Sequence, residues 1–153
     1  MASEALAPLD VEEISLVPLG TMTAKLAEPI ALVGTCAGAR FVYEVIDARL
    51  EGERISASMT GSAAADWLIV GPDGTGTLDV RATLVTDDGA VVFVQYNGRC
   101  DVRNGPGTAP VYVAPRFETG DERYAWLNRV QAVGKGRFDL TTSLITYRWY
   151  EIV

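Results

Sequence analysis

The sequence contains no histidine, and it contains only two cysteines, Cys36 and Cys100. Without histidine the chain cannot form the Ser-His or Cys-His pairs of nucleophilic catalysis, and it lacks the commonest side-chain metal ligand. The two cysteines lie far apart in the sequence and lack the close spacing of a redox or zinc motif. Because cytosolic disulfides are rare, we interpret both cysteines as free, buried thiols.

Long apolar runs are also missing, since no stretch approaches the roughly 20 residues that a bilayer-spanning helix needs. The sequence begins with MASEALAPLDVEE, which has no basic segment followed by an apolar stretch, as a secretory signal would require. We therefore expect a soluble, cytoplasmic protein that does not act at a membrane.

Basic residues are outnumbered, with 13 Lys and Arg against 20 Asp and Glu and a net charge of −7. This charge repels phosphate backbones, and no basic stripe is visible along the sequence, so we predict that nucleic acid is not a partner. The turn GPDGTG lacks the lysine of a phosphate-binding loop, and no aspartate-rich loop has calcium spacing. We expect no metal and no cofactor, which leaves carboxylates, tyrosine, lysine and arginine for any chemistry.

Short β-rich runs separated by turn residues make up most of the 153 residues. Residues 77–99 give the clearest signal, two strands joined at Asp88-Gly89, because this dipeptide tolerates the backbone angles of a tight hairpin turn. No segment before residue 120 has a sustained helical period. We predict an all-β fold, a single-domain antiparallel β-barrel of about eight to ten strands over residues 14–153, preceded by a flexible segment at residues 1–13.

One short helix is predicted near residues 121–128, within the stretch RFETGDERYAWLN. Thr119 and Glu122 have the spacing of a capping box, in which each side chain accepts a hydrogen bond from the other's backbone N–H. Asn128 suits the C-terminal end of the helix. We expect this helix to cover one end of the sheet.

The strand at residues 77–86 leaves two interpretations open. Its apolar and polar residues alternate, and the polar face includes Asp79 and Arg81. In an ordinary barrel this pair is exposed, whereas in a barrel with a ligand cavity the polar face can line the interior. The next strand places Tyr96 on a face with small aliphatic residues. Asp66, which precedes Trp67 in an apolar strand, is either a surface residue near a turn or a buried acid whose pKa is raised by desolvation.

Two stretches, ADWLIVGPDGTGTLDVRATLVTDDGAVVFVQYNG and APRFETGDERYAWLN, resemble the domain of unknown function 3237 family, and the match extends over about residues 15–152. Members of that family are similar to a compact antiparallel β-barrel, which agrees with the predicted fold. The resemblance implies functional importance for Asp66, for Asp79 and Arg81 in LDVR, and for the residues of RFET and YAWLN. Family members often carry a tyrosine after the motif that reads LDVR in this chain, where this chain has Thr83. The resemblance favours an interior location for the polar residues.

We consider three functions for such a barrel. The first is a cofactor-independent isomerase, cyclase or lyase that moves a proton on a small, largely apolar carbonyl or phenolic compound. Asp66 or Asp79 would act as the general base, and Arg81 or Arg116 would stabilise the oxyanion. The second function is a non-catalytic small-molecule binding or carrier barrel. The third is an oligomeric accessory protein whose interior is filled by its own side chains.

A small molecule in the barrel would contact further polar and aromatic side chains. We expect these substrate-binding residues to be Trp67, Tyr96, Glu118, Tyr124, Trp126 and Asn128. Tyr96 and Asn128 would also donate hydrogen bonds to the oxyanion. Exposed aliphatic faces on a closed sheet favour a homodimer or a larger homo-oligomer.

Overall fold

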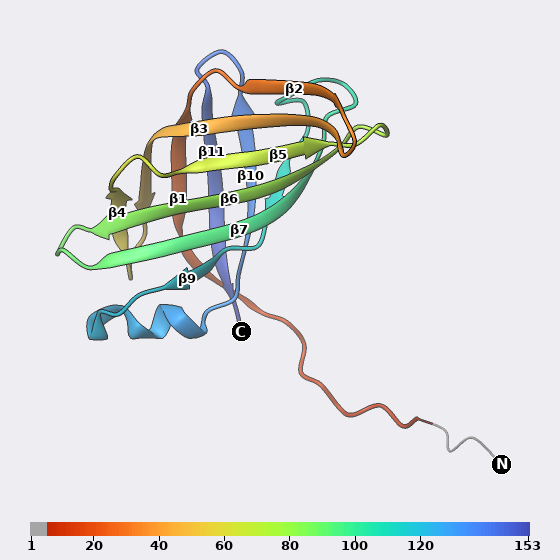
Figure 1. Ribbon diagram of the computed structural model, residues 1–153. Helices are drawn as coiled ribbons and strands as arrows, with labels where there is room; N and C mark the ends of the chain where they lie inside the picture. Colours follow the sequence, from red (N-terminus) through yellow and green to blue (C-terminus); the bar gives the residue numbers. More distant parts are fainter. Residues whose placement is uncertain (1–5) are drawn as a thin grey trace.

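The computed structural model describes residues 6–153, which form eleven β-strands and one 3₁₀ helix (Figure 1). Within these residues no helix is long and apolar enough to cross a membrane. In chain order the elements are β1 (Leu16–Leu26), β2 (Ile30–Thr35), β3 (Gly38–Glu51), β4 (Ser56–Met59), β5 (Ala65–Val70), β6 (Thr75–Thr86), β7 (Val91–Asp101), β8 (Val111–Val113), β9 (Arg116–Glu118), the helix η1 (Glu122–Arg129), β10 (Ala132–Asp139) and β11 (Leu144–Ile152).

Eight strands close into an antiparallel barrel in the order β1, β3, β5, β6, β7, β8, β10 and β11, and β11 pairs back to β1. Three short strands lie outside this ring. β2 pairs with β3, β4 fills the gap between β3 and β6 beyond the end of β5, and β9 pairs with β7. The predicted all-β antiparallel barrel with one short helix is confirmed, and the outer strands bring the total to eleven.

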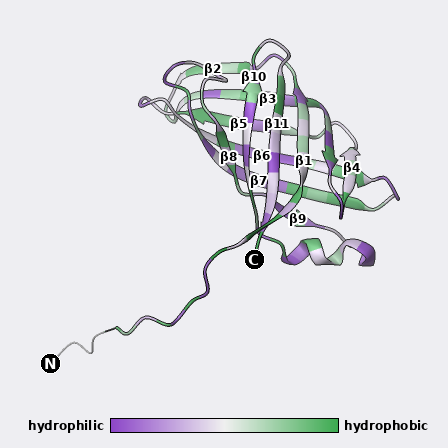
Figure 2. Ribbon diagram, turned by 180° about the vertical axis from the view of Figure 1, so that it is seen from behind, coloured by the Kyte–Doolittle hydropathy of each residue, from purple (hydrophilic) through white to green (hydrophobic). Residues whose placement is uncertain are grey.

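Side-chain alternation along β6 settles which face of this strand packs in the core. The four apolar residues from Leu78 to Leu84 are at most 7% exposed, while Asp79 and Arg81 lie on the outer face. Figure 2 shows this alternation of hydrophobic and hydrophilic residues along the barrel strands. The interior location expected for Asp79 and Arg81 is therefore wrong. Burial of the apolar face stabilises the fold more than burial of the polar face would, and this difference in free energy fixes the register of the strand.

The predicted hairpin at Asp88-Gly89 is confirmed and joins β6 to β7. Their pairing begins at Val85 opposite Val91, directly beside the turn. Gly89 has a φ of 96°, a left-handed conformation that favours glycine. The hydroxyl of Thr86 donates to the Asp88 carboxylate at 2.6 Å, which holds the turn in place.

The helix η1 is observed where the sequence predicts a short helix, and it lies beside β9 at one end of the barrel (Figure 1). Its N-cap is Asp121, whose side chain accepts a hydrogen bond from the backbone N–H of Arg123 at 3.0 Å. The predicted capping box at Thr119 is wrong, because the Thr119 hydroxyl instead donates to the backbone carbonyl of Val91 at 2.8 Å. Asn128 exchanges two hydrogen bonds with the backbone of Thr119, at 2.8 and 3.0 Å.

Two glycines of β10 make room for aromatic rings inside the barrel. Gly134 lies opposite Trp149 and Gly136 lies opposite Tyr147, and a Cβ atom at either glycine would collide with the facing ring. Both rings are 1% exposed, and both pack edge to face against Tyr96 with centroids 5.6 and 5.9 Å away. Because Trp149 also contacts β9, the strand beside η1, these rings fill the half of the barrel nearest the helix.

The chain before β1 makes no helix or strand between residues 6 and 15, and it leads away from the barrel (Figure 1). The flexible segment predicted at residues 1–13 therefore lies partly outside the described residues. The two cysteines are free, as predicted. Cys100 is half-buried, but Cys36 is exposed in the turn between β2 and β3, so the prediction of a buried thiol is wrong there.

Candidate active site

Asp66 lies on the inner face of β5. Its cross-strand partners are Tyr43 on β3 and Val80 on β6, and Val80 pairs in turn with Tyr96 on β7. Residues directly opposite each other on neighbouring strands point to the same face of a sheet. Val80 and Tyr96 are buried in the core, so Tyr43, Asp66, Val80 and Tyr96 form one transverse row inside the barrel, which we call the inner row.

A cavity of about 60 Å³ separates the inner row from the loop at residues 102–110, at the end of the barrel opposite η1. Four residues of this loop form part of the cavity wall, Val102, Pro106, Gly107 and Ala109. The polar side chains that reach the cavity are Tyr43, Asp66, Cys100 and Asp101. The main apolar walls are Leu26, Leu68, Leu78, Val111, Phe138 and Ile145.

The Asp66 carboxyl group has a pKa of about 7, chiefly because burial disfavours its charged form. The backbone N–H of Asp79 donates a hydrogen bond to Asp66 Oδ1 at 3.1 Å, which lowers the pKa, while the negative charge of Asp79 raises it. At neutral pH such a group is present in both protonation states. It can therefore accept a proton and return it.

Tyr43 and Cys100 lie beside Asp66 and hold their protons at neutral pH. Desolvation raises the pKa of the Tyr43 phenol and of the Cys100 thiol, and the negative charge of Asp66 adds to both shifts. The Tyr43 ring packs edge to face against Phe138 with the centroids 6.2 Å apart, which fixes the ring against the cavity wall. Tyr43 thus supplies an O–H donor to the same cavity as the Asp66 carboxylate.

Tyr96 lies in the inner row with Asp66, and the ring of Tyr147 packs edge to face against the Tyr96 ring with the centroids 5.9 Å apart. Burial raises the pKa of both phenol groups, with a further contribution from the charge of Asp66. The structure therefore brings Tyr96, a predicted substrate-binding residue, into the inner row with Asp66. Its ring is 7% exposed and packs against other aromatic rings, and it is not among the residues that line the cavity.

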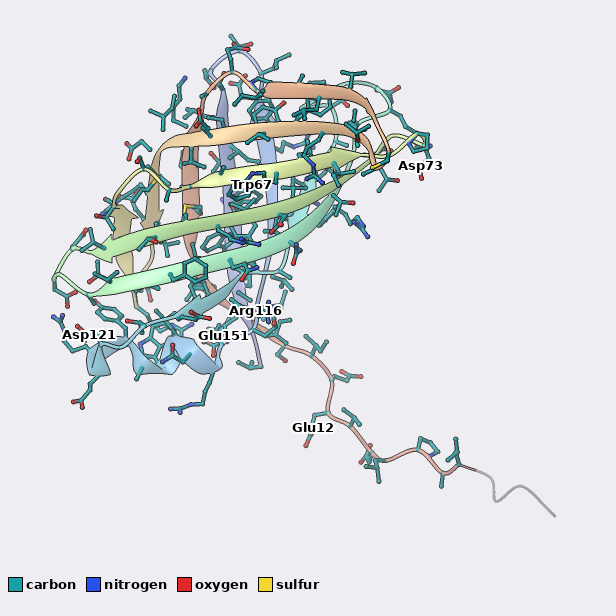
Figure 3. The ribbon with its side chains drawn as sticks, in the orientation of Figure 1. Glu12, Trp67, Asp73, Arg116, Asp121 and Glu151 are labelled. Carbon is teal, nitrogen blue, oxygen red and sulfur yellow. The ribbon has the colours of Figure 1, made fainter. Side chains whose placement is uncertain are left out.

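Three predicted catalytic residues lie outside the barrel. Arg81 and Asp79 form an ion pair of 3.8 Å with their side chains 52% and 38% exposed, and the Arg81 guanidinium lies 5.8 Å from the ring of Trp67 on the same outer face. Arg116 is exposed on β9 (Figure 3). The prediction that Asp79, Arg81 and Arg116 share an interior site with Asp66 is wrong, because each belongs to the polar, outward set of its strand.

The remaining predicted residues lie near η1 rather than at the cavity. Glu118 and Arg116 border a separate outer groove of about 250 Å³ next to Asn128. Tyr124 donates a hydrogen bond to Asp88 at 2.9 Å, and Asn128 holds the backbone before η1. The ring of Trp126 lies under the Arg54 guanidinium at 4.7 Å. The structure thus gives these side chains contacts that stabilise the helix end of the barrel.

Sequence reasoning missed Tyr43, Cys100 and Phe138, which share the cavity with Asp66. The alternation in the stretch RFVYEV is compatible with an inward Tyr43, but only the pairing of β3 with β5 places it beside Asp66. No group of three or more His, Cys, Asp or Glu side chains that could hold a metal ion occurs among residues 6–153.

Comparison with known proteins agrees with the fold and with the motifs. The family model described as "Protein of unknown function (DUF3237)" matches residues 14–152. A UPF0311 protein from Rhodopseudomonas palustris strain CGA009 is 30% identical over 129 residues, which cover 74% of this chain and 82% of that protein. The crystal structure of a protein of unknown function from Clostridium acetobutylicum has a TM-score of 0.83 at 22% identity and covers 92% of this chain and 100% of its own. That of an enzyme from Penicillium herquei has a TM-score of 0.71 at 21% identity and covers 96% of this chain and 100% of its own.

Proposed function

The chain belongs to the DUF3237 family, and we propose that it is a cofactor-independent enzyme in which Asp66 moves a proton on a small, largely apolar carbonyl or phenolic compound. The reaction class is an isomerisation, a cyclisation or an elimination. One observation carries the proposal: the Asp66 carboxyl group lies in an apolar cavity and has a pKa of about 7. A structural carboxylate is more stable in water, whereas a general base benefits from a pKa near the working pH.

Asp66 acts as the base and Tyr43 as the hydrogen-bond donor to the developing oxyanion. The carboxylate of Asp66 takes a proton from an acidic C–H or O–H group of the substrate. The electron pair left behind moves onto the substrate oxygen, where the Tyr43 O–H donates a hydrogen bond. Because the pKa of Tyr43 is raised, its phenol keeps its proton and stabilises the oxyanion without being consumed. Asp66 then returns the proton to another atom of the substrate.

The apolar walls of the cavity indicate the kind of substrate. A cavity of about 60 Å³ is smaller than the about 150 Å³ cavity that holds benzene in an engineered protein. A substrate with a ring therefore places only its reacting end beside Asp66, or it displaces the loop at residues 102–110. This loop has glycines with φ of 98° and 78° at Gly105 and Gly107, conformations that an L side chain rarely adopts.

A similar fold in a protein described as an enzyme, from Penicillium herquei, supports catalysis in a barrel of this kind. At 21% identity the likeness concerns the fold alone. For this chain we infer catalysis from Asp66 and Tyr43 in the cavity.

The test is proton exchange on simple ketones. We expect the protein to accelerate replacement of the α-hydrogens of butanone and cyclopentanone by deuterium in D₂O, measured by NMR. The rate should rise with pH and level off above about 7, where Asp66 is ionised. Replacement of Asp66 by Asn should lower it by about 10² to 10⁴-fold. Asp79→Asn, on the outer face, is the matched control and should retain exchange.

A carrier barrel is the second candidate, and the almost wholly apolar cavity wall favours it. A carrier needs apolar walls and a hydrogen-bond donor, but it needs no titratable group. If these ketones or phenol raise the melting temperature of the protein and of Asp66→Asn equally, and neither protein exchanges protons, the carrier function replaces the enzymatic one. If exchange occurs and Asp66→Asn exchanges as fast as the native protein, the role of Asp66 is disproved.

A further inference from the structure

Four cations lie together on the outer face of the barrel. Three of these cations and one tyrosine form a row of cross-strand partners across four neighbouring strands. The row consists of Arg99 on β7, Tyr112 on β8, Lys135 on β10 and Arg148 on β11. Arg137 lies two residues beyond Lys135 on the same face of β10. All five side chains are exposed, and we call them the basic wall.

The cations of the basic wall have no carboxylate partner among residues 6–153, because every ion pair there involves other basic residues. Lys135 Nζ lies 5.8 Å from the centre of the Tyr112 ring, and Arg99 donates to the Thr77 hydroxyl. In a chain of net charge −7, such a cluster attracts an anionic partner. The sequence shows no basic stripe because the row is assembled from four separate strands.

The segment before β1 has the complementary chemistry. Asp10 and Glu12 alternate with Leu9 and Val11 in the stretch LDVEEI, and Glu13 adds a further negative charge. Leu9 and Val11 are 88% and 77% exposed, so the aliphatic side chains pack against nothing in the monomer. Glu12 lies well away from the barrel (Figure 3).

We propose that the N-terminal segment, residues 6–14, of one copy of the chain docks in extended form on the basic wall of a second copy. In an extended chain Asp10 and Glu12 point to the same side about 7 Å apart, which is also the repeat of Lys135 and Arg137 along β10. Tyr112, 53% exposed between the cations, offers an apolar contact for the aliphatic side chains of the segment. Reciprocal exchange of two segments closes a dimer.

The second copy is favoured over the chain's own barrel as the docking site. Ser15 and Val153 exchange two backbone hydrogen bonds of 2.8 and 2.9 Å, which fix the direction in which the segment leaves the barrel. To reach its own basic wall the chain would have to reverse just before this point. Residues 11–14, VEEI, contain none of the residues that favour such a turn, which are glycine, proline, asparagine, aspartate and serine.

The test is a charge exchange in the full-length chain, with the molar mass measured by sedimentation velocity. We expect a dimer at 50 mM salt that weakens at 500 mM salt, because the screening length for exposed ion pairs falls from about 14 Å to about 4 Å between these concentrations. The wall variant K135E/R137E and the segment variant D10K/E12K should each raise the dimer dissociation constant about tenfold or more. An equimolar mixture of the two variants should dimerise again, because each reversed surface then meets its complement.

Arg129→Glu, an exposed charge reversal on η1 outside the basic wall, is the control and should leave the dimer unchanged. Circular dichroism of each variant checks that the barrel remains folded. A native chain that is monomeric at 50 mM salt overturns the proposal, and so does a dimer that both variants leave intact. If the monomer instead binds a short DNA oligonucleotide through Lys135 and Arg137, the basic wall serves nucleic acid. None of these results depends on the chemistry of Asp66.

Discussion

The two halves of the barrel interior are built from the same strands but are packed differently. In the half beside η1, the rings of Tyr96, Phe117, Tyr147 and Trp149 pack edge to face or tilted at centroid distances of 5.6 to 6.4 Å. In the half beneath the loop at residues 102–110, aliphatic side chains and the rings of Tyr43 and Phe138 surround a cavity of about 60 Å³. Asp66 lies at the boundary between them, in the inner row.

The two halves therefore differ in role, because the half filled with rings stabilises the barrel and the half with the cavity holds the reactive group. Close-packed rings supply most of the apolar burial per residue, and the glycines of β10 let them approach each other. The half with the cavity is less closely packed, and it holds Asp66, whose charged form is destabilised by burial. Such a sacrifice of stability is common where a protein holds a reactive group in place.

The largest expected effect comes from removing a ring in the filled half. Trp149→Ala should lower the free energy of unfolding by about 3 to 5 kcal/mol, because the 1% exposed indole leaves a cavity that its neighbours cannot close. Phe138→Ala in the half with the cavity is the matched variant and should lower it by about 1 to 2 kcal/mol, since that ring already borders empty space. Urea unfolding measures both. Equal losses would mean that the two halves are packed alike.

A pH-dependent effect of similar size should arise from Asp66. Its pKa is about 7 in the folded protein, against an ordinary value of 3.8, so the folded state holds the proton more tightly than the unfolded state. Its contribution to stability is therefore full below pH 3.8 and is lost as the pH rises to about 7, a change on the order of 4 kcal/mol.

Asp66→Asn, which is neutral at every pH, should gain stability relative to the native protein across this range. Urea unfolding of both proteins between pH 4 and pH 8 gives the difference directly, and acid effects on other groups cancel. A difference that does not change with pH would show that Asp66 has an ordinary pKa.

Two valines on β8 allow a matched comparison of the halves. Val111 lines the cavity, whereas Val113 lies against Gly134 and faces the filled half. The added methyl group of Val113→Ile should lower the free energy of unfolding by about 1 to 3 kcal/mol, because the site has no room for it. Val111→Ile should leave it unchanged or raise it by up to about 1 kcal/mol, because the methyl group enters the cavity. The same loss from both variants would contradict the existence of a usable cavity.

The sequence predicts the barrel well because its signals are local. Alternation along residues 77–99 and the Asp88-Gly89 turn depend on neighbouring residues only, and both are confirmed. The division of residues 111–118 into the three-residue strands β8 and β9 depends on pairing with distant strands, so the sequence alone does not reveal it. The capping box at Thr119 shows the limit, because the hydroxyl bonds to a distant strand instead.

The candidate site is less predictable for the same reason. Asp66 stands out because it is an acid in an apolar strand without a nearby basic residue. Tyr43 has no such signal, since only the pairing of β3 with β5 brings it to Asp66. Asp79 and Arg81 carry a pattern that fits either face of the strand, and the family resemblance pointed to the wrong one. In the folded chain the apolar face of β6 packs in the core, and this places Asp79 and Arg81 on the outer face.

The smallest effect is expected on the outer face. Replacing Asp79 and Arg81 together by Ala should change the free energy of unfolding by less than about 1 kcal/mol, because their ion pair of 3.8 Å is exposed and is screened by water. Asp79→Ala should nevertheless lower the pKa of Asp66 slightly, since the charge of Asp79 acts on it through the sheet while the backbone N–H of residue 79 still donates to it. A ¹³C NMR titration of the Asp66 carboxyl group measures this shift. A rise in that pKa, or a large loss of stability, would show that the outer pair is part of the site after all, and the division between a polar outside and a reactive inside would then fail.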